Sequence, residues 1–192
     1  VSIIIPHWNG IDVISECIES LKRSTLPSFE IIVSDNASSD GSQAWIKEKH
    51  PDIILLENDE NYGYAGGCNY GSDLAKGEFL LFLNNDTIQN PNWLQPLVDR
   101  MKSDETIAAL QPKILNYYSR NIFDYAGGSG GHLDLFCFPF ARGRVFLEQE
   151  KDSGQYDEAQ KCFWASGTAM LVRKKVFFAA GKFDETFFAH ME

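Results

Sequence analysis

The sequence predicts an α/β fold, in which helices flank a doubly wound, mostly parallel central sheet. In the first half, short apolar runs alternate with helical patterns and give four strand–helix units in a row. Such units form parallel strands joined by right-handed crossovers. The fourth run, Phe79–Leu83, is apolar at every position, which is typical of a central strand covered on both faces. An irregular insertion is expected in the second half.

The strand–helix units are predicted in order from the amino end. The first strand covers residues 2–5 and is closed by Pro6. The next apolar residues recur at helical spacing, at Val13, Ile14, Cys17, Ile18 and Leu21. The remaining predictions are a strand over 30–34, a helix over 43–49, a strand over 53–56, a helix ending near Lys76 and Gly77, and a helix over 93–101 after Pro91.

The regular pattern stops between about residues 119 and 160. The stretch is rich in turn residues, namely Gly127, Gly128, Gly130, Gly131, Pro139 and Gly143. It predicts a long irregular insertion that can include a small hairpin, and loops of this length are usually functional or flexible. A last strand over 169–172 and a short helix through Ala180, ended by Gly181, complete the prediction.

Composition excludes several classes of function. The chain has 17 Lys and Arg against 27 Asp and Glu, a net charge of -10, so nucleic acid is not an expected partner. Its four cysteines form no C-x-x-C pair, so neither zinc nor a disulfide scaffold is expected. With no recognisable signal peptide or membrane-spanning run, we expect a cytoplasmic domain with both ends at boundaries inside a longer protein.

In open α/β sheets ligands bind at the carboxyl ends of the strands, so the residues after each strand are the candidates. The first strand is followed by Pro6-His7-Trp8-Asn9-Gly10, which lacks the G-x-G-x-x-G of a dinucleotide-binding domain. This absence counts against a dehydrogenase. Pro6 stiffens the turn, and Trp8 is either a platform for a nucleotide base or a core aromatic.

The second strand leads into two aspartates with different predicted roles. Asp40 is explained as a helix N-cap, with Gln43 completing a capping-box-like pair. Asp35 lies at the end of the strand, where its carboxylate can accept a hydrogen bond from the imide N–H of uracil or thymine.

Two further runs follow the third and fourth strands. Asn61-Tyr62-Gly63-Tyr64-Ala65-Gly66-Gly67-Cys68-Asn69 opens a helix with small residues, which either bring backbone N–H groups close to an anion or form a plain tight turn. In Asn84-Asn85-Asp86, a carboxylate at the end of a buried strand would be costly unless paired, so we expect Asp86 to hold Mg²⁺ or Mn²⁺ against a diphosphate. A structural aspartate capping the turn is the alternative.

Three other residues have two interpretations each. Arg142 and Arg144 either clamp a donor or acceptor phosphate or belong to a solvated loop. His190 is either structural or a metal or acceptor ligand.

Together these runs resemble the family-two glycosyltransferases, and more closely the rhamnosyltransferase-like branch of bacterial surface-polysaccharide enzymes. The opening run is similar to that family's nucleotide-binding start, and Asp35 falls at its base-contacting aspartate. The stretch from Asn61 to Asn69 is similar to its N-x-G-x-A-x-G-x-N run, and Asn84-Asn85-Asp86 occupies the place of its D-x-D motif. Residues 167–173 and 181–188 resemble its acceptor-side segment.

This resemblance covers nearly the whole chain and implies a GT-A-type fold with named site residues. The expected nucleotide-binding residues are Pro6, Trp8, Asn9, Asp35, Gly66, Asn69, Asn84 and Asn85. Asp86 is the expected metal ligand, with Mg²⁺ or Mn²⁺ as cofactor. The family motif often carries two aspartates, whereas Asn84 stands in the first place here, so substrate phosphates would have to compensate for the lost carboxylate.

The resemblance also implies a catalytic pair at the carboxyl end. Glu192 matches the first acidic residue of the pair, and the expected general base is the residue after it, number 193. A base is needed because an acceptor hydroxyl is a poor nucleophile until a carboxylate takes its proton. Inversion follows from a single displacement at the anomeric carbon. A chain ending at Glu192 is expected to bind donor better than it transfers sugar.

The function implied is therefore an inverting hexosyltransferase of polysaccharide biosynthesis, which moves a sugar, with rhamnose leading, from a dTDP- or UDP-sugar to a glycan or lipid-linked glycan acceptor. Residues 1–112 are the expected nucleotide-sugar-binding half and 113–192 the acceptor-side half of one domain, with at most peripheral contact with the inner face of the cytoplasmic membrane. The alternatives are an inactive nucleotide-sugar-binding module and a sugar-phosphate nucleotidylyltransferase, which would require a basic residue after the first strand.

Overall fold

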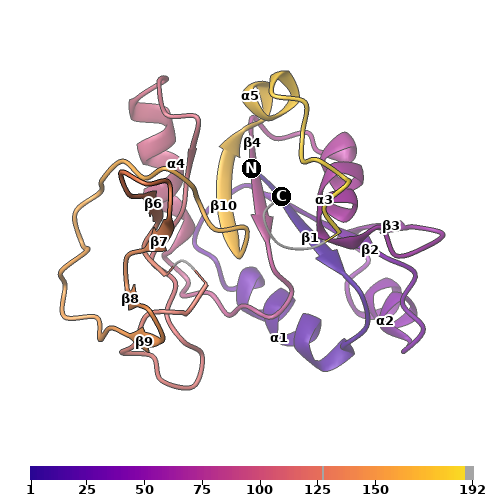
Figure 1. Cartoon of the computed structure of the whole chain (residues 1–192). Helices are drawn as coiled ribbons and strands as arrows, with labels where there is room; N and C mark the ends of the chain where they lie inside the picture. Colours follow the sequence, from indigo (N-terminus) through magenta and orange to yellow (C-terminus); the bar gives the residue numbers. More distant parts are fainter. Residues whose placement is uncertain (127, 189–192) are drawn as a thin grey trace.

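The computed structural model describes residues 1–126 and 128–188. Its centre is a six-stranded sheet, and Figure 1 shows the molecule with most of these strands labelled. The strand order is β3-β2-β1-β4-β10-β5. Strands β1 to β4 run parallel, whereas β10 is antiparallel to both β4 and β5. The bounds are β1 (Ser2–His7), β2 (Glu30–Asp35), β3 (Ile54–Glu57), β4 (Phe79–Leu83), β5 (Ala109–Leu110) and β10 (Ala169–Arg173). The predicted mostly parallel sheet is confirmed.

Helices cover both faces of the sheet. Their bounds are α1 (Ile11–Lys22), α2 (Ser42–Lys49), α3 (Gly63–Leu74), α4 (Leu94–Ser103) and α5 (Lys174–Ala179). One buried cluster joins the sheet to α1, α2 and α4, and a second joins it to α3 and α5. The sheet is therefore doubly wound, as predicted. None of the helices in the described ranges is long and apolar enough to cross a bilayer.

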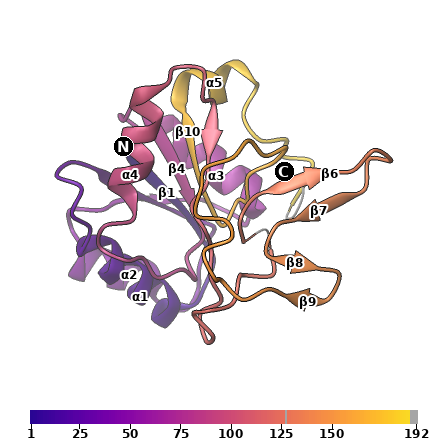
Figure 2. The same cartoon turned by 90° about the vertical axis from the view of Figure 1, so that its left-hand side faces the viewer.

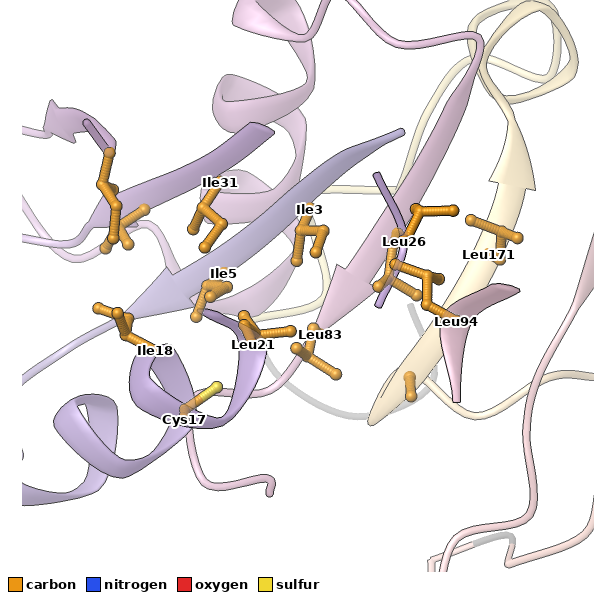
Figure 3. Close-up of a cluster of buried hydrophobic side chains, with 14 of the residues drawn as sticks. Ile3, Ile5, Cys17, Ile18, Leu21, Leu26, Ile31, Leu83, Leu94 and Leu171 are labelled. Atoms are coloured by element: carbon orange, nitrogen blue, oxygen red, sulfur yellow. The ribbon is translucent and has the colours of Figure 1, made fainter. Parts of the chain in front are cut away.

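The alternation of side chains along β1 explains this two-sided core. Ile3 and Ile5 are fully buried and point toward Leu21 and Cys17 of α1 (Figure 3). Ile4, between them, belongs to the cluster on the opposite face. A strand with apolar residues on both faces requires that helices cover both faces of the sheet, because an uncovered face would expose them.

Glycines let α3 approach the end of β1 closely. A Cβ at Gly71 would lie 2.6 Å from Ile4 Cγ2, and one at Gly67 would lie 2.9 Å from Pro6 Cβ. Both separations are too short for side-chain atoms, so only glycine fits. This close packing brings the amino end of α3 near the carboxyl ends of β1 and β2.

The prediction that Pro6 closes the first strand was wrong. β2 pairs with β1 through His7, while β4 pairs with it only from Ser2 to Ile4. Because Pro6 lies beyond the last residue paired with β4, only the β2 side of the ladder reaches it, and a proline is tolerated there.

The predicted capping box at α2 was also wrong. Gly41 is the N-cap residue and has a left-handed backbone with φ 92°. Asp40 instead accepts hydrogen bonds from the N–H groups of Gly10 and Ile11, at the start of α1, and from Ser42. Gln43 donates to Asp35 rather than reaching back to Asp40.

The insertion contains two hairpins where at most one was predicted. They are β6 (Gly131–Leu133) with β7 (Pro139–Ala141), and β8 (Arg144–Val145) with β9 (Glu148–Gln149). Both lie at the β10 side of the sheet, away from β3 (Figure 1), and Figure 2 shows β7 of the first hairpin next to β8 of the second. The two-residue edge strand β5 was not predicted either.

Candidate active site

The carboxyl ends of β1, β2 and β4 bring three polar side chains together. His7 is the register partner of Asp35 in the neighbouring strand. On its other side, His7 Nδ1 lies 2.9 Å from Asn85 Nδ2. Burial lowers the pKa of His7, although the carboxylates of Asp35 and Asp40 act in the opposite direction. Asn85 Nδ2 can only donate, so Nδ1 is the acceptor in this contact, and in a neutral ring the proton is then on Nε2.

Asp35 is fully buried and has one carboxylate oxygen left over. Oδ1 accepts hydrogen bonds from the Ser38 N–H at 2.9 Å and from Gln43 Nε2 at 2.5 Å. Asp35 Oδ2 and His7 Nε2 are also buried, and neither has a hydrogen-bond partner among the described residues. An unpaired buried polar group costs about 1–3 kcal/mol, so such groups usually meet a ligand or water. The sheet edge thus holds one unsatisfied acceptor and one unsatisfied donor.

His7 was not among the sequence-predicted site residues. The strand pattern could have indicated its direction. Side chains alternate along a strand, so His7 lies on the same face of β1 as Ile3 and Ile5, the face toward α1. Its partners come from β2 and from the turn after β4, and strand order is needed to know that both are neighbours.

Trp8 and Asn9 occupy the turn after β1. Trp8 is 58% exposed, which excludes the interpretation as a core aromatic and leaves its ring accessible for stacking. Asn9 joins this turn to the β2–α2 loop, because its N–H donates to Ser38 Oγ and its Oδ1 accepts from the Ser39 N–H. These hydrogen bonds therefore fix the turn after β1 against the loop after β2.

Asp86 is exposed, contrary to the expectation of a buried carboxylate. The chain leaves the sheet after Leu83, where the Asn84 N–H donates to the Thr168 carbonyl and the Asn84 carbonyl accepts from Thr87 Oγ1. Thr87, rather than Asp86, closes this turn. The carboxylate of Asp86 accordingly faces solvent at the carboxyl edge of the sheet.

The residues around Asp86 fit a divalent cation that is shared with a substrate. Within the described ranges no group of three His, Cys, Asp or Glu side chains forms a complete metal site. A single carboxylate with neighbouring amide oxygens suits Mg²⁺ or Mn²⁺ when phosphates and waters supply the other ligands. Asn84 and Asn85 are half-buried beside it.

The glycine-rich run forms the first turns of α3, and two of its predicted nucleotide ligands have contacts within the protein. A Cβ at Gly66 would lie 2.5 Å from the Cβ of Tyr62 in the preceding turn. Asn69 is buried, and its amide binds the segment after α5: Nδ2 donates to the Phe183 carbonyl and to Glu185, and Oδ1 accepts from the Phe183 N–H. Their contact with a nucleotide stays a prediction.

Arg142 and Arg144 of the insertion are both held by the protein rather than freely solvated. Arg142 donates to the carbonyl of Ser129 and to Gln160. Arg144 lies 4.7 Å from the ring centroid of Tyr125 and donates through Nε to the Phe146 carbonyl at 2.5 Å. His190 and Glu192 lie outside the described residues.

Two proteins with similar sequences are an O-antigen biosynthesis protein and a glucosyltransferase. The chain is 30% identical to the O-antigen biosynthesis protein RfbC of Myxococcus xanthus over 97% of this chain and 15% of RfbC. It is 38% identical over 92 residues to a poly(ribitol-phosphate) beta-glucosyltransferase of Bacillus spizizenii, which covers 45% of this chain and 14% of that protein. The chain thus spans a small part of both. Neither is named as a rhamnosyltransferase.

Solved glycosyltransferases share the fold at low identity. The structure of S. aureus TarS 1-349 in complex with UDP matches with a TM-score of 0.70 and 18% identity over 98% of this chain and 51% of that chain. A mannosyltransferase from Pyrobaculum calidifontis, in complex with GDP-Man and Mn²⁺, matches with a TM-score of 0.66 and 18% identity over 96% of this chain and 47% of that chain. The fold is therefore of the GT-A type. Because the model of the family described as glycosyl transferase family 2 matches residues 2–178, this chain belongs to that family.

Proposed function

We propose that this domain transfers a sugar, with inversion, from a dTDP- or UDP-sugar to a glycan or lipid-linked glycan acceptor. The observation that carries the proposal is the buried carboxylate of Asp35, whose Oδ2 has no partner among the described residues, beside the exposed Trp8. The imide edge of uracil or thymine has an N–H next to a carbonyl. The N–H would satisfy Asp35 Oδ2, the carbonyl would accept from His7 Nε2, and Trp8 would stack on the base.

The diphosphate would then lie toward the end of β4. Asn84 or Asn85 would contact the ribose, and Asp86 would hold Mg²⁺ or Mn²⁺ together with the phosphate oxygens. The bound metal would neutralise the charge that develops on the leaving diphosphate. Rhamnose is the leading donor sugar by resemblance only.

The general base remains the residue after Glu192, as the family resemblance implies. It would take the proton of the acceptor hydroxyl during attack on the face opposite to the diphosphate. The domain would act in polysaccharide biosynthesis in the cytoplasm, at the inner face of the membrane where the acceptor is lipid-linked.

Calorimetric titration of UDP, dTDP, GDP, CDP and ADP, with and without MnCl₂, tests the donor site. We expect UDP and dTDP to bind in a Mn²⁺-dependent manner. In cytosine and adenine the ring nitrogen at this edge carries no hydrogen and would meet Asp35 Oδ2 as a second acceptor, so CDP and ADP should bind about 10- to 100-fold more weakly. Asp86→Ala should abolish the dependence on Mn²⁺, while Glu60→Ala, another exposed acid, should preserve it. Tightest binding of GDP would refute the uracil or thymine assignment, and persistent Mn²⁺ dependence in Asp86→Ala would refute the metal site.

Catalysis requires a protein extended past Glu192. If residue 193 is acidic, its replacement by the amide should abolish transfer while nucleotide binding persists. An apolar residue at 193, together with no transfer across a panel of donors, would favour the inactive-module alternative.

A further inference from the structure

A large cleft opens beside Asn84, next to the proposed donor site. Its volume is about 1230 Å³, and its walls come from the sheet side and from the insertion. Asn84, Tyr64 and Thr168 lie on the sheet side, and Tyr125 and Phe140 lie on the insertion side. Pockets of about 300–1,000 Å³ hold drug-sized ligands, so this one has room for more than a single sugar ring.

Aromatic rings form much of the cleft wall. They are Tyr64, Tyr125, Phe138, Phe140, Phe146, Trp164 and Phe183. Polar side chains lie between them, namely Asn84, Asp134, Arg144, Ser166 and Thr168. This mixture matches a pyranose ring, which packs its C–H faces on aromatic rings while its hydroxyl groups form hydrogen bonds at the ring edge.

Several of these side chains are fixed in place by the protein. A Cβ at Gly131 would fall 1.6 Å from the Trp164 ring, so the indole lies directly on the backbone of β6. Tyr64 donates its hydroxyl to the Gly167 carbonyl at 2.6 Å. Arg144 covers the ring of Tyr125 and also donates to the Tyr125 carbonyl. A wall held in this way loses little side-chain entropy when a ligand binds.

The charge of the lining distinguishes between acceptor classes. Arg144 is the cation and Asp134 the anion among the residues that line the cleft, so their formal charges cancel. A polyol-phosphate chain would require several cations, and a polyprenyl tail would remove water from both charged side chains. A neutral sugar matches this balance best.

We propose that the cleft binds neutral pyranose units of the acceptor glycan. The proposal rests on the proposed function, because Asn84 belongs both to the cleft and to the predicted donor site. An acceptor bound there would present its hydroxyl group next to the sugar of the donor, as transfer requires.

The test measures binding of methyl glycosides and of di- and trisaccharides of glucose, galactose, mannose and rhamnose to the full-length protein, by saturation-transfer NMR and calorimetry. We expect at least one neutral saccharide to bind. Tyr125→Ala and Phe140→Ala should each weaken the binding of that saccharide at least 10-fold. Phe163→Ala, an exposed ring outside the cleft lining, is the matched control and should bind as the wild type does.

Nucleotide titrations of the same proteins keep this proposal separate from the donor site. Unchanged UDP binding in Tyr125→Ala and Phe140→Ala would show that they fold and that the donor site is intact. Saccharide binding that survives both substitutions would overturn the proposal. So would failure of every saccharide while oligo(ribitol phosphate) or a polyprenyl phosphate in detergent binds in a Tyr125-dependent manner. A wild-type protein that does not bind UDP would instead contradict the proposed function.

Discussion

Asp40 links two segments that are distant in the sequence. Its Oδ2 accepts hydrogen bonds from the N–H groups of Gly10 at 2.7 Å and Ile11 at 3.0 Å, and its Oδ1 accepts from the Ser42 N–H at 3.0 Å. The carboxylate therefore serves the amino ends of both α1 and α2, where negative charge is favourable. Asp40 is exposed, and although some loss of solvent opposes its ionisation, the hydrogen bonds from Ser42, Gly10 and Ile11 outweigh this effect and lower the pKa of Asp40 to about 2.

We predict that Asp40→Asn lowers the free energy of unfolding by about 0.6–2 kcal/mol at about pH 7, because a negative charge near each of the two helix amino ends usually contributes about 0.3–1 kcal/mol. Because the pKa of Asp40 is lower in the folded state than in the unfolded state, ionisation contributes stability above the unfolded value of about 3.9. That contribution is lost as the pH falls toward about 2. The difference between wild type and Asp40→Asn should therefore shrink between about pH 4 and pH 2, as measured by urea unfolding.

The matched control for this substitution is Glu60→Gln, which removes the same charge from an exposed site. It should change stability by less than about 0.5 kcal/mol at every pH, as surface substitutions usually do. An Asp40→Asn protein that follows the control across the pH range would contradict the role assigned to Asp40.

At the scale of elements, the start of α3 and the segment after α5 form one unit. Asn69 pairs its amide with the backbone of Phe183 in both directions, at 3.0 and 3.1 Å. The Tyr64 N–H donates to the Phe188 carbonyl at 2.8 Å. A Cβ at Gly63 would lie 2.2 Å from the same carbonyl oxygen. These contacts hold the segment that leads toward the predicted catalytic pair.

We predict that Asn69→Ala, in the full-length protein, lowers kcat about 10- to 100-fold while the Kd for UDP changes by less than about two-fold. The reason is that small displacements of catalytic groups are costly, whereas this amide already has partners within the protein. Asp73→Asn is the control, since it breaks only a partly exposed ion pair to Lys182 in the same segment and should alter kcat little. A large rise in the Kd for UDP would instead support the predicted contact between Asn69 and the nucleotide.

The elements also show what periodicity can and cannot predict. Strands such as Phe79–Leu83 were predicted because burial requires an unbroken apolar run, and α1 because its apolar residues recur at helical spacing. A small hairpin was expected in the insertion, but its position and the second hairpin were missed because these strands are only two or three residues long. The antiparallel direction of β10 depends on how the chain returns from the insertion, which no local pattern encodes.

Prediction of the candidate site from the sequence was limited in the same way. Asp35 was identified because it follows a strand directly, and its place at the strand end needs no knowledge of neighbours. His7 was missed because its importance comes from Asp35 and Asn85, which adjoin it only when β2 and β4 flank β1. The exposure of Asp86 was mispredicted because the course of the chain after β4 depends on a hydrogen bond to Thr168.

For the molecule as a whole, stability should differ between the sheet and the insertion. The side chains of β4 are buried along its whole length between β1 and β10. The turns of the two hairpins instead expose large apolar side chains, at Leu135, Phe136, Phe146 and Leu147. Segments with few buried contacts open locally at low free energy, while a central strand opens only with the entire fold.

We predict that brief digestion with chymotrypsin cleaves first within residues 135–147, where aromatic side chains are exposed on short turns. Phe79 and Phe82 are equally suitable for the protease but are buried, so cleavage there should wait for global unfolding. Mass spectrometry of the first products identifies the sites. Phe163→Ala removes an exposed aromatic residue outside the hairpins and should leave the first cuts unchanged, whereas Phe136→Ala with Phe146→Ala should slow them. Early cleavage after Phe79 or Phe82 would show that the sheet opens as readily as the insertion, and would contradict the predicted difference in stability between the two.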